Sequence, residues 1–359
     1  MSIEFHPLPV RVRPETADSV CVSFDIPDDL RDTFRFVPGQ HLVLRADLDG
    51  EDVRRSYSIC TGIDAPNPSV GIKRIPGGAF STYATTELAD GDVIDVMAPI
   101  GEFHHHPDPQ AACNYVALAA GSGITPVLSI LTSILDVEAH SRCTLVYGNR
   151  STTSIMFLEE LEALKNRYPD RFQVIHVLSR EPHEVPLFQG RIDADKLESL
   201  ARSLISVPDI DSWFICGPLD MVETAVATLA ELGVDDARIN TELFFDERID
   251  TVPDAPVDGD GLVTLTLTID GRSSVVQVDP EGPPLLDYAR SVRAEVPFAC
   301  KGGMCATCKC QVLEGEVAMN KNYALTDEET AAGFVLSCQA HPVDGDVSIT
   351  YDVHGGMGR

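Results

Sequence analysis

Four cysteines near the carboxyl end of the chain have the spacing of a metal centre. They are Cys300, Cys305 and Cys308, separated by four and two residues, and Cys338 further along. This is the plant-type pattern C-x4-C-x2-C…C, in which four thiolates hold the two irons of a 2Fe-2S cluster. The segment 300–308 is too short for regular structure, so we expect a loop around the cluster. Because such a cluster passes single electrons, another group must handle electron pairs.

A structural zinc site is the alternative for these thiols. Zinc sites favour paired C-x2-C segments around one tetrahedral ion, whereas this chain has one such segment and a distant fourth cysteine. Gly302 and Gly303 favour the cluster, because they allow positive φ and bring backbone N–H groups close to sulfur. Cys310 follows in a predicted strand, where its side chain alternates away from the loop. We expect it to be a small buried residue and not a ligand.

Three short motifs in the first third of the chain suit a dinucleotide. The segment RSYS at 55–58 is predicted on a strand, and GIKR at 71–74 and GGAFST at 77–82 follow it. An arginine and hydroxyls at alternate strand positions can bind a diphosphate and the edge of an isoalloxazine ring, and a glycine turn can present N–H groups to phosphate. Taken singly, each motif is compatible with an ordinary strand that has solvated ends. Their order along the chain favours a flavin site.

A second glycine-rich segment, GSGITP at 121–126, ends a predicted buried strand. Glycines at a strand-to-helix turn let a dinucleotide approach the backbone, and the helix N-terminus favours its diphosphate. The motif departs from G-x-G-x-x-G at its last position, and a generic tight turn is the alternative. Support comes from CGP at 216–218 after a later strand, because ligands of open α/β sheets bind where the strands end.

The elements that must position these motifs fall into three predicted domains. Residues 1–110 contain short strands separated by turns, which is typical of an antiparallel β-barrel. Residues 111–249 alternate apolar runs with helix-length stretches, which indicates an α/β domain on a parallel sheet. The segment 250–261, rich in Pro, Gly and Asp, is predicted to be a linker. Residues 262–359 form a predicted α+β domain that opens with a hairpin through Asp270-Gly271.

The charge balance limits the partners of the chain. Its 359 residues include 27 Lys and Arg against 56 Asp and Glu, a net charge of −29. This excess of negative charge, with no basic run, is unfavourable for binding nucleic acid. No apolar stretch is long enough to span a membrane, and the first residues lack the features of a signal peptide. We therefore expect a cytoplasmic protein with no nucleic acid or membrane partner, whose cysteines stay reduced.

Two further features receive structural interpretations. His104, His105 and His106 are consecutive, and three consecutive side chains cannot all face one ion from a strand or a helix, so a solvated loop is predicted. Trp213 begins an apolar run and is predicted to lie in a core. Hydrolase and kinase chemistry are disfavoured, since the sequence has no Ser-His-Asp set, HExxH pair or P-loop.

The motifs RxYS, GGxxS, GSGITP and CGP in this order resemble the ferredoxin-NADP reductase superfamily, and the cysteine domain resembles plant-type ferredoxin, a β-grasp fold. Their fusion is similar to the reductase components of multicomponent oxygenases. The strings VGIKRIPGGAFS, CKGGMCATCKCQV and NYALTDEETAAGFVLSCQA are especially similar to reductase subunits of phenylacetyl-CoA epoxidases, which are di-iron monooxygenases. The resemblance implies hydride transfer from NAD(P)H to FAD, and then single electrons through a 2Fe-2S cluster to an oxygenase partner.

The resemblance also assigns roles to residues. Arg55 would hold the FAD diphosphate, Tyr57 would pack on the isoalloxazine, and Ser58 would hydrogen-bond near its N5. Ser58 and Cys216 are the expected catalytic residues. The other expected FAD contacts are Ile72, Lys73, Arg74, Gly78, Phe80 and Ser81, with Phe244 covering the flavin, although Phe245 is equally apolar and both are compatible with a core. The expected coenzyme contacts are Gly121, Gly123, Thr125, Pro126, Arg150, Cys216 and Gly217, and the expected iron ligands are Cys300, Cys305, Cys308 and Cys338.

The choice of coenzyme and of oxygenase is less specific. The segment GNRS at 148–151 has no Asp or Glu where a ribose 2'-hydroxyl would be held. Arg150 with Ser151 suits a 2'-phosphate, which favours NADPH over NADH, and a solvated loop arginine is the alternative. Other functions to weigh are the reductase of a ring-hydroxylating dioxygenase or steroid hydroxylase and, in a different class, a non-enzymatic redox sensor or zinc-held binding module.

Overall fold

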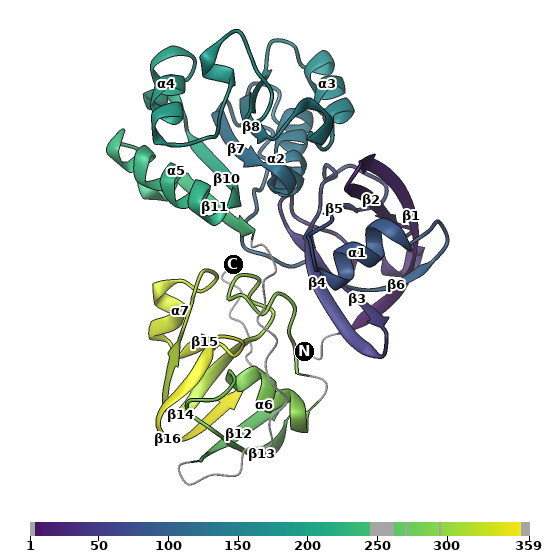
Figure 1. Ribbon diagram of the computed structural model, residues 1–359, viewed down its shortest axis with the longest axis vertical. Helices are drawn as coiled ribbons and strands as arrows, with labels where there is room; N and C mark the ends of the chain where they lie inside the picture. The colour runs from purple at the N-terminus through teal and green to yellow at the C-terminus, as the bar shows by residue number, and fades with distance from the viewer. Residues whose placement is uncertain (1–3, 245–261, 270, 294–295, 353–359) are drawn as a thin grey trace. The chain divides into compact units, whose positions relative to one another are not determined.

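The computed structural model describes residues 4–244, 262–269, 271–293 and 296–352, apart from the side chains of Glu51 and Phe244. Its strands form three sheets (Figure 1). By its contacts the chain divides into two units: the larger holds most of the first two sheets, and the smaller holds the third. The predicted linker 250–261 and the turn residue Asp270 lie outside the described residues. Within the described ranges, every helix is too short or too polar to span a lipid bilayer.

The first sheet is an antiparallel barrel. Its strands are β1 (Phe5–Thr16), β2 (Ser19–Phe24), β3 (His41–Leu48), β4 (Glu51–Ser58), β5 (Ser69–Lys73) and β6 (Val93–Met97), with helix α1 (Ala79–Thr86) after β5. The order is β4-β3-β6-β1-β2-β5, and a bridge between Ile59, just after β4, and Val70 of β5 joins the two ends. Val20 and Val22 alternate into the barrel core, as the period of two along a strand requires.

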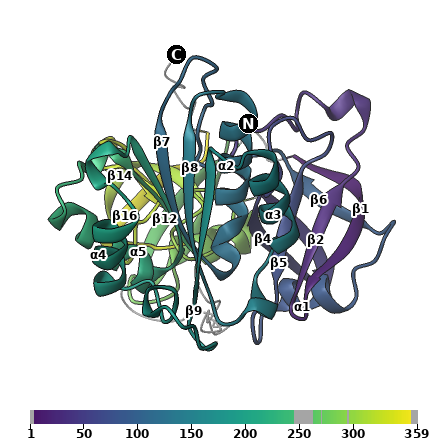
Figure 2. The same cartoon turned by 90° about the horizontal axis from the view of Figure 1, so that it is seen from above.

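The second sheet has five parallel strands between two layers of helices. The strands are β7 (Asn114–Ala120), β8 (Arg142–Asn149), β9 (Phe172–Leu178), β10 (Ser212–Pro218) and β11 (Ile239–Phe244), and the helices are α2 (Ile124–Val137), α3 (Leu158–Arg167), α4 (Ala194–Ser203) and α5 (Leu219–Glu231). Figure 2 shows α2 and α3 on one side of the strands and α4 and α5 on the other. The two apolar clusters agree with these faces. Burial on both faces explains why the strands read as nearly continuous apolar runs.

The strand order of the second sheet, β11-β10-β7-β8-β9, places its switch point between β7 and β10. From β7 the chain proceeds outward through β8 and β9, and it then returns to the other side of β7 for β10 and β11. Loops that leave neighbouring strands in opposite directions open a crevice at the carboxyl ends of those strands. The short helix η2 (Gly121–Gly123) follows β7 at this edge, and Cys216 to Pro218 end β10 there.

A buried carboxylate fixes the connection between the first two sheets. Glu138, which follows α2, is fully buried and accepts hydrogen bonds from the Tyr115 hydroxyl at 3.1 Å and the Ser141 hydroxyl at 2.6 Å. His105 Nε2 lies 3.1 Å from the same carboxylate. The prediction that His105 is solvated is therefore wrong. Its ring lies beside the buried Glu138 carboxylate, which is 33 residues away in the sequence. Burial lowers the pKa of His105, and Glu138 opposes that shift.

The third sheet is mixed. It contains β12 (Val263–Ile269), β13 (Arg272–Val278), β14 (Lys309–Met319), β15 (Phe334–Leu336) and β16 (Ala340–Thr350), with helices α6 (Leu285–Val292) and α7 (Asp327–Ala331). The order is β13-β12-β16-β14-β15, in which β12 and β16 are parallel, whereas β12 with β13, β14 with β15 and β14 with β16 are antiparallel. The predicted hairpin is present, since β12 pairs with β13 from Val263 opposite Val278 to Ile269 opposite Arg272.

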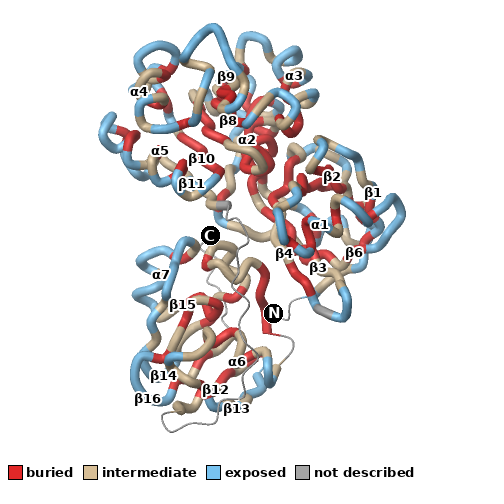
Figure 3. The backbone as a smooth tube through the Cα atoms, viewed as in Figure 1, coloured by how far each residue is buried: buried red, intermediate tan, exposed pale blue. Residues whose placement is uncertain are grey.

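Each sheet has its own buried core, as Figure 3 shows by the buried segments along the strands. Trp213 at the start of β10 is fully buried, as predicted. None of the ten cysteines forms a disulfide. The predicted fold class, an antiparallel barrel followed by a parallel α/β sheet and an α+β domain, is confirmed.

Candidate functional site

The cysteine loop between α6 and β14 curls tightly. Lys301, Gly303 and Ala306 adopt positive φ values of 50°, 80° and 51°. Two of these residues carry side chains, and they occupy the left-handed region only at an energetic cost that the surrounding structure must offset. The curl directs the Gly302 N–H at Cys300 Sγ, 3.4 Å away. Such N–H groups stabilise negative charge on sulfur.

The four predicted iron ligands interact as two pairs. Cys300 contacts Cys305, and Cys308 contacts Cys338, in each case through their thiols. A two-iron cluster needs this arrangement, because each iron takes two thiolates in addition to the bridging sulfides. A tetrahedral zinc would draw all four to one point. No group of three His, Cys, Asp or Glu side chains surrounds a single ion position in the part of the chain that the structure describes. The residues present therefore fit a 2Fe-2S cluster.

Neighbouring side chains tie the loop to the third sheet. Gln339 Nε2 donates to the Lys301 carbonyl at 2.8 Å and lies 3.8 Å from Cys338 Sγ. A Cβ on Gly303 would come within 3.1 Å of both Gln339 and the backbone of Lys321, so the close approach requires glycine. Cys310, on β14, is fully buried as predicted.

The expected flavin residues cluster around the end of β4. Tyr57 lies beside Phe80 of α1, with ring centroids 5.6 Å apart, and Ser58 ends the strand almost fully buried. Arg55 lies on the same strand, two residues before Tyr57. Lys73, at the end of β5, forms an ion pair with Asp18 at 3.0 Å. Arg74 follows it as an exposed residue.

Part of the expected flavin set is buried or already hydrogen-bonded within the barrel. Ile72 and Phe80 are fully buried in the barrel core. The Ser81 hydroxyl is already used within the turn, where it accepts a hydrogen bond from the Ile75 N–H at 3.1 Å. Gly78 begins α1, so what this segment offers a phosphate is the N–H groups of the first helical turn.

The coenzyme motif lies where β7 meets β10. A Cβ on Gly123 would stand 2.2 Å from the Cys216 carbonyl oxygen and 2.9 Å from Gly217 N, so this crossing tolerates no side chain. Gly121 has φ +54°, with nothing within 4 Å of the position its Cβ would take. Thr125 and Pro126 lie buried in the first turn of α2, which confirms the predicted strand-to-helix turn.

A carboxyl group that the sequence analysis missed joins the two expected catalytic residues. Glu242 lies on β11, beside Cys216 of β10 in register. The Ser58 hydroxyl donates to Glu242 Oε2 at 3.1 Å, and Cys216 Sγ lies 3.9 Å from the same oxygen. Ser58 belongs to the barrel, and Cys216 and Glu242 belong to the second sheet. The three side chains thus place a titratable group between the flavin motif and the coenzyme motif.

Loss of contact with water raises the pKa of Glu242 to about 8, and the hydrogen bonds from Ser58 and Cys216 only partly oppose this. This shift favours the neutral form of the carboxyl group at pH 7. Burial also raises the pKa of the Cys216 thiol far above its ordinary value, so this sulfur is neutral too. The site holds its protons without a fixed negative charge.

Two other expectations concern the ends of β11 and β8. The side chain of Phe244 and the whole of Phe245 lie outside the described residues. Arg150 is exposed just beyond β8, and its carbonyl accepts a hydrogen bond from the Arg180 N–H at 2.8 Å. Arg180, which follows β9, was not among the predicted residues. The sequence could have indicated it, because Ser179 and Arg180 come directly after an apolar run.

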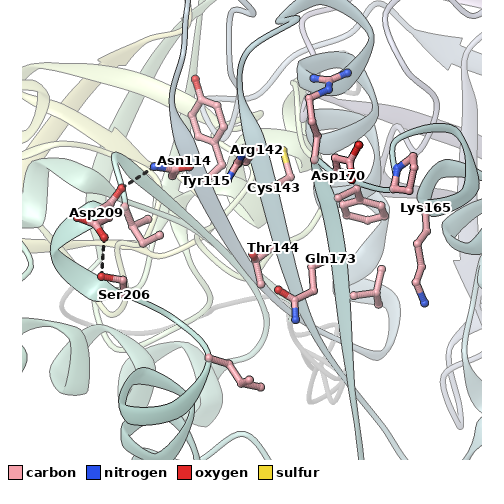
Figure 4. A pocket seen from close by; sticks show the side chains of 16 residues that line it. Asn114, Tyr115, Arg142, Cys143, Thr144, Lys165, Asp170, Gln173, Ser206 and Asp209 are labelled. Atoms are coloured by element: carbon pink, nitrogen blue, oxygen red, sulfur yellow. Dashed lines mark hydrogen bonds between the residues drawn. The ribbon is translucent and has the colours of Figure 1, made fainter.

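A pocket of the described residues lies elsewhere. It lies at the amino edge of the second sheet, opposite to the coenzyme motif (Figure 4). Its lining includes the first residues of β7, β8 and β9, which are Asn114, Arg142 and Phe172. It shares no residue with the flavin, coenzyme or cysteine motifs. The amino edge of a parallel sheet is not where such folds bind their dinucleotides, so the pocket plays no part in the site.

Three domain families match the chain. Residues 12–105 match the Oxidoreductase FAD-binding domain, residues 117–227 match the Oxidoreductase NAD-binding domain, and residues 267–343 match the 2Fe-2S iron-sulfur cluster binding domain. The matches follow the order of the motifs. The predicted set of FAD, a nicotinamide coenzyme and a 2Fe-2S cluster is confirmed.

Two relatives match almost from end to end. A 1,2-phenylacetyl-CoA epoxidase subunit of Escherichia coli (strain K12) is 44% identical over 98% of this chain and 99% of its own length. The 3-ketosteroid-9-alpha-monooxygenase ferredoxin reductase component of Rhodococcus rhodochrous is 35% identical over 94% of each chain. Among solved structures, phthalate dioxygenase reductase has a TM-score of 0.62 at 20% identity, over 96% of this chain and 98% of its own, which shows a shared fold.

The cluster assignment predicts opposite results for two neighbouring buried cysteines. Cys338→Ala should reduce the iron content from about two per chain to nearly none and abolish the visible absorption of the cluster. Cys310→Ala, the matched control, should keep both, because this thiol faces the core. Iron analysis and absorption spectra of the purified variants measure this. Full iron in Cys338→Ala, or its loss in Cys310→Ala, would contradict the ligand set.

Proposed function

Because this chain belongs to the family of reductase components of multicomponent oxygenases, we propose that its partner is a di-iron phenylacetyl-CoA epoxidase and that its preferred coenzyme is NADPH. The family makes it an NAD(P)H-dependent flavin and iron-sulfur oxidoreductase that passes electrons to an oxygenase component. This membership decides against a non-enzymatic binding module. When bound, FAD and the cluster supply the conversion of an electron pair into single electrons.

The protein side of this chemistry is binding and orientation. Arg55, Tyr57 and the first turn of α1 hold the flavin, and the turn after β7 holds the coenzyme diphosphate at the start of α2. Cys300, Cys305, Cys308 and Cys338 hold the cluster. The contact between Ser58 and Glu242 joins the expected flavin-binding and coenzyme-binding segments, and it is the observation that supports hydride transfer between them.

Glu242 keeps this contact neutral. The Ser58 hydroxyl lies 3.1 Å from Glu242 Oε2, and the neutral carboxyl carries a proton that it can donate to a neighbouring acceptor. A carboxylate at this position would oppose the build-up of negative charge on the flavin when a hydride arrives. Glu242 and Ser58 thus hold a proton beside the site of transfer, and Cys216 packs against them.

Two arginines support the choice of NADPH. Arg150 and Arg180 follow neighbouring strands, their backbones are hydrogen-bonded to each other, and both side chains are exposed at the carboxyl edge. The Glu181 carboxylate fixes the two loops by accepting from the Thr152 N–H and hydroxyl at 2.8 and 2.9 Å. Two guanidinium groups on adjacent loops suit the dianionic 2'-phosphate that distinguishes NADPH from NADH.

The identity of the oxygenase is supported by the relatives. Identity to the phenylacetyl-CoA epoxidase subunit is 44%, against 35% for the steroid monooxygenase component. A steroid hydroxylase is therefore the second candidate. The cytoplasm remains the predicted compartment, and the ten cysteines, none of which forms a disulfide, support it.

The pKa of Glu242 predicts a pH dependence. As pH rises through about 8 the carboxyl ionises, so reduction of the bound flavin by NADPH should slow several-fold. Glu242→Gln stays neutral and should keep its rate across the same range. The folded chain binds this proton more tightly than the unfolded chain, so the contribution to stability is full below pH about 4.5 and is lost as pH rises to about 8. Stopped-flow absorbance measures the rate, with the exposed Glu223→Gln as control. A profile unchanged by Glu242→Gln would contradict this role.

The arginine pair predicts coenzyme preference. Removing both guanidinium groups, in Arg150→Ala with Arg180→Ala, should raise the KM for NADPH about tenfold or more and leave that for NADH nearly unchanged, because only NADPH carries the 2'-phosphate. Arg142→Ala, at the opposite end of β8, is the matched control. Steady-state kinetics with both coenzymes provide the measurement. Unaltered use of NADPH by the double variant would defeat the assignment.

The partner assignment is tested by reconstitution. With the phenylacetyl-CoA epoxidase oxygenase component, the chain should consume NADPH in step with epoxide formation, at a rate at least tenfold above that with a 3-ketosteroid 9α-hydroxylating component. Cys338→Ala should still reduce ferricyanide but support neither oxygenase, because the single-electron exit is lost. Equal or better coupling to the steroid oxygenase would reject the epoxidase as partner.

A further inference from the structure

We propose that Asn149, the last residue of β8, is a coenzyme-binding residue, and that its side-chain amide donates a hydrogen bond to an oxygen of the ADP-ribose portion of NAD(P)H. The inference rests on the proposed binding of the coenzyme at the carboxyl edge of the second sheet. It concerns neither the 2'-phosphate nor the nicotinamide. It assigns a contact that serves both coenzymes alike.

The register of the sheet places Asn149 beside the coenzyme turn. Ala120 of β7 pairs with Gly148 of β8, so the next residues, Gly121 and Asn149, stand next to each other as the two strands end. Gly121 turns the chain at positive φ, and the space where its side chain would be is open. Asn149 therefore borders the room left for a dinucleotide at the switch point.

Tyr147 fixes the loops on both sides of this position. Its ring is fully buried, and its hydroxyl lies 2.9 Å from the Gly121 carbonyl and 3.4 Å from the Met156 carbonyl. The phenol thus ties the turn after β7 to the segment before α3. Tyr147 and Asn149 are two residues apart on one strand, so their side chains share a face of the sheet. The neighbourhood of Asn149 is rigid before any ligand arrives.

The amide of Asn149 lacks a partner in this neighbourhood. Asn149 is only 8% exposed, and its Nδ2 has no hydrogen-bond partner. The amide lies near the Tyr147 hydroxyl and lowers the tyrosine pKa against the rise that burial causes. The geometry between the two groups is not that of a well-formed hydrogen bond. The backbone carbonyl of Asn149 is occupied by the Ser179 N–H at 2.9 Å. A buried donor left unpaired costs about 1–3 kcal/mol, which an incoming acceptor can recover.

The other buried donors without partners do not share this position. Trp213 Nε1 belongs to the first residues of β10, at the amino side of the sheet, and His176 lies in the middle of β9. Within the described part of the second sheet, Asn149 is the unpaired buried donor that ends a strand at the carboxyl edge. That edge also carries the start of α2, where the diphosphate is expected. The acceptor that fits is therefore an oxygen of the diphosphate or of the ribose attached to it.

Calorimetric titration of the FAD-loaded oxidised protein with ADP-ribose and with NADP⁺ tests the inference. Asn149→Ala should weaken binding of both ligands by about five- to tenfold, the value of one hydrogen bond. Asn149→Asp, which keeps the shape but places an anion near the diphosphate, should weaken both further. Asn114→Ala, an asparagine at the opposite end of the neighbouring strand β7, should leave both affinities unchanged.

The outcomes separate this inference from the proposed function. Failure of the unmodified protein to bind either ligand would reject coenzyme binding itself. Normal binding by the unmodified protein together with unchanged affinity in both Asn149 variants would overturn the role of Asn149. An effect on NADP⁺ but not on ADP-ribose would also overturn it, because the contact would then involve the 2'-phosphate. Flavin content and thermal unfolding of each variant show that the fold is retained, and Asn149→Asp carries the test if Asn149→Ala is unstable.

Discussion

The hydrogen bond from Ser58 to Glu242 is the interaction on which the site depends. It joins the last residue of a barrel strand to the last strand of the parallel sheet, 184 residues away in the chain. The flavin motif and the coenzyme motif come together only if these strand ends stay in register. The raised pKa of the carboxyl is part of the constraint, since burial favours its neutral form.

Other contacts hold the same two sheets together without taking part in the chemistry. A Cβ on Gly71 of β5 would come within 2.7 Å of Thr125 and 2.9 Å of the Phe157 ring, so the barrel touches the coenzyme turn directly. Glu15 of β1 accepts from the Phe157 N–H at 2.7 Å. Phe157 itself has a positive φ of 58°, which a bulky residue adopts only when its surroundings compensate. The positions of Ser58, Cys216 and Glu242 are thus set by interfaces away from them.

The sequence predicted those parts of the site whose signal is local. The cysteine spacing and the glycines at 121 and 123 follow from what a short loop or turn can physically do, and the three sheets follow from apolar periodicity. Glu242 was missed because a carboxyl group in the segment NTELFF has no local feature, and its raised pKa arises from burial, which the hydrogen bonds from Ser58 and Cys216 only partly oppose. The contact of His105 was missed for the same reason, because its partner Glu138 lies 33 residues away in the sequence. Burial of Ile72 and internal bonding of Ser81 likewise depend on packing that a motif does not encode.

Infrared spectroscopy can show directly whether the carboxyl group of Glu242 is protonated at pH 7. The difference spectrum between the unmodified protein and Glu242→Gln isolates the C=O stretch of one protonated carboxyl group as pH is varied. We expect this band to be present at pH 7 and to disappear with a midpoint near 8. A band that has already vanished by pH 6, with a midpoint near the ordinary value of 4.5, would show an ionised carboxylate at the junction and would contradict the account.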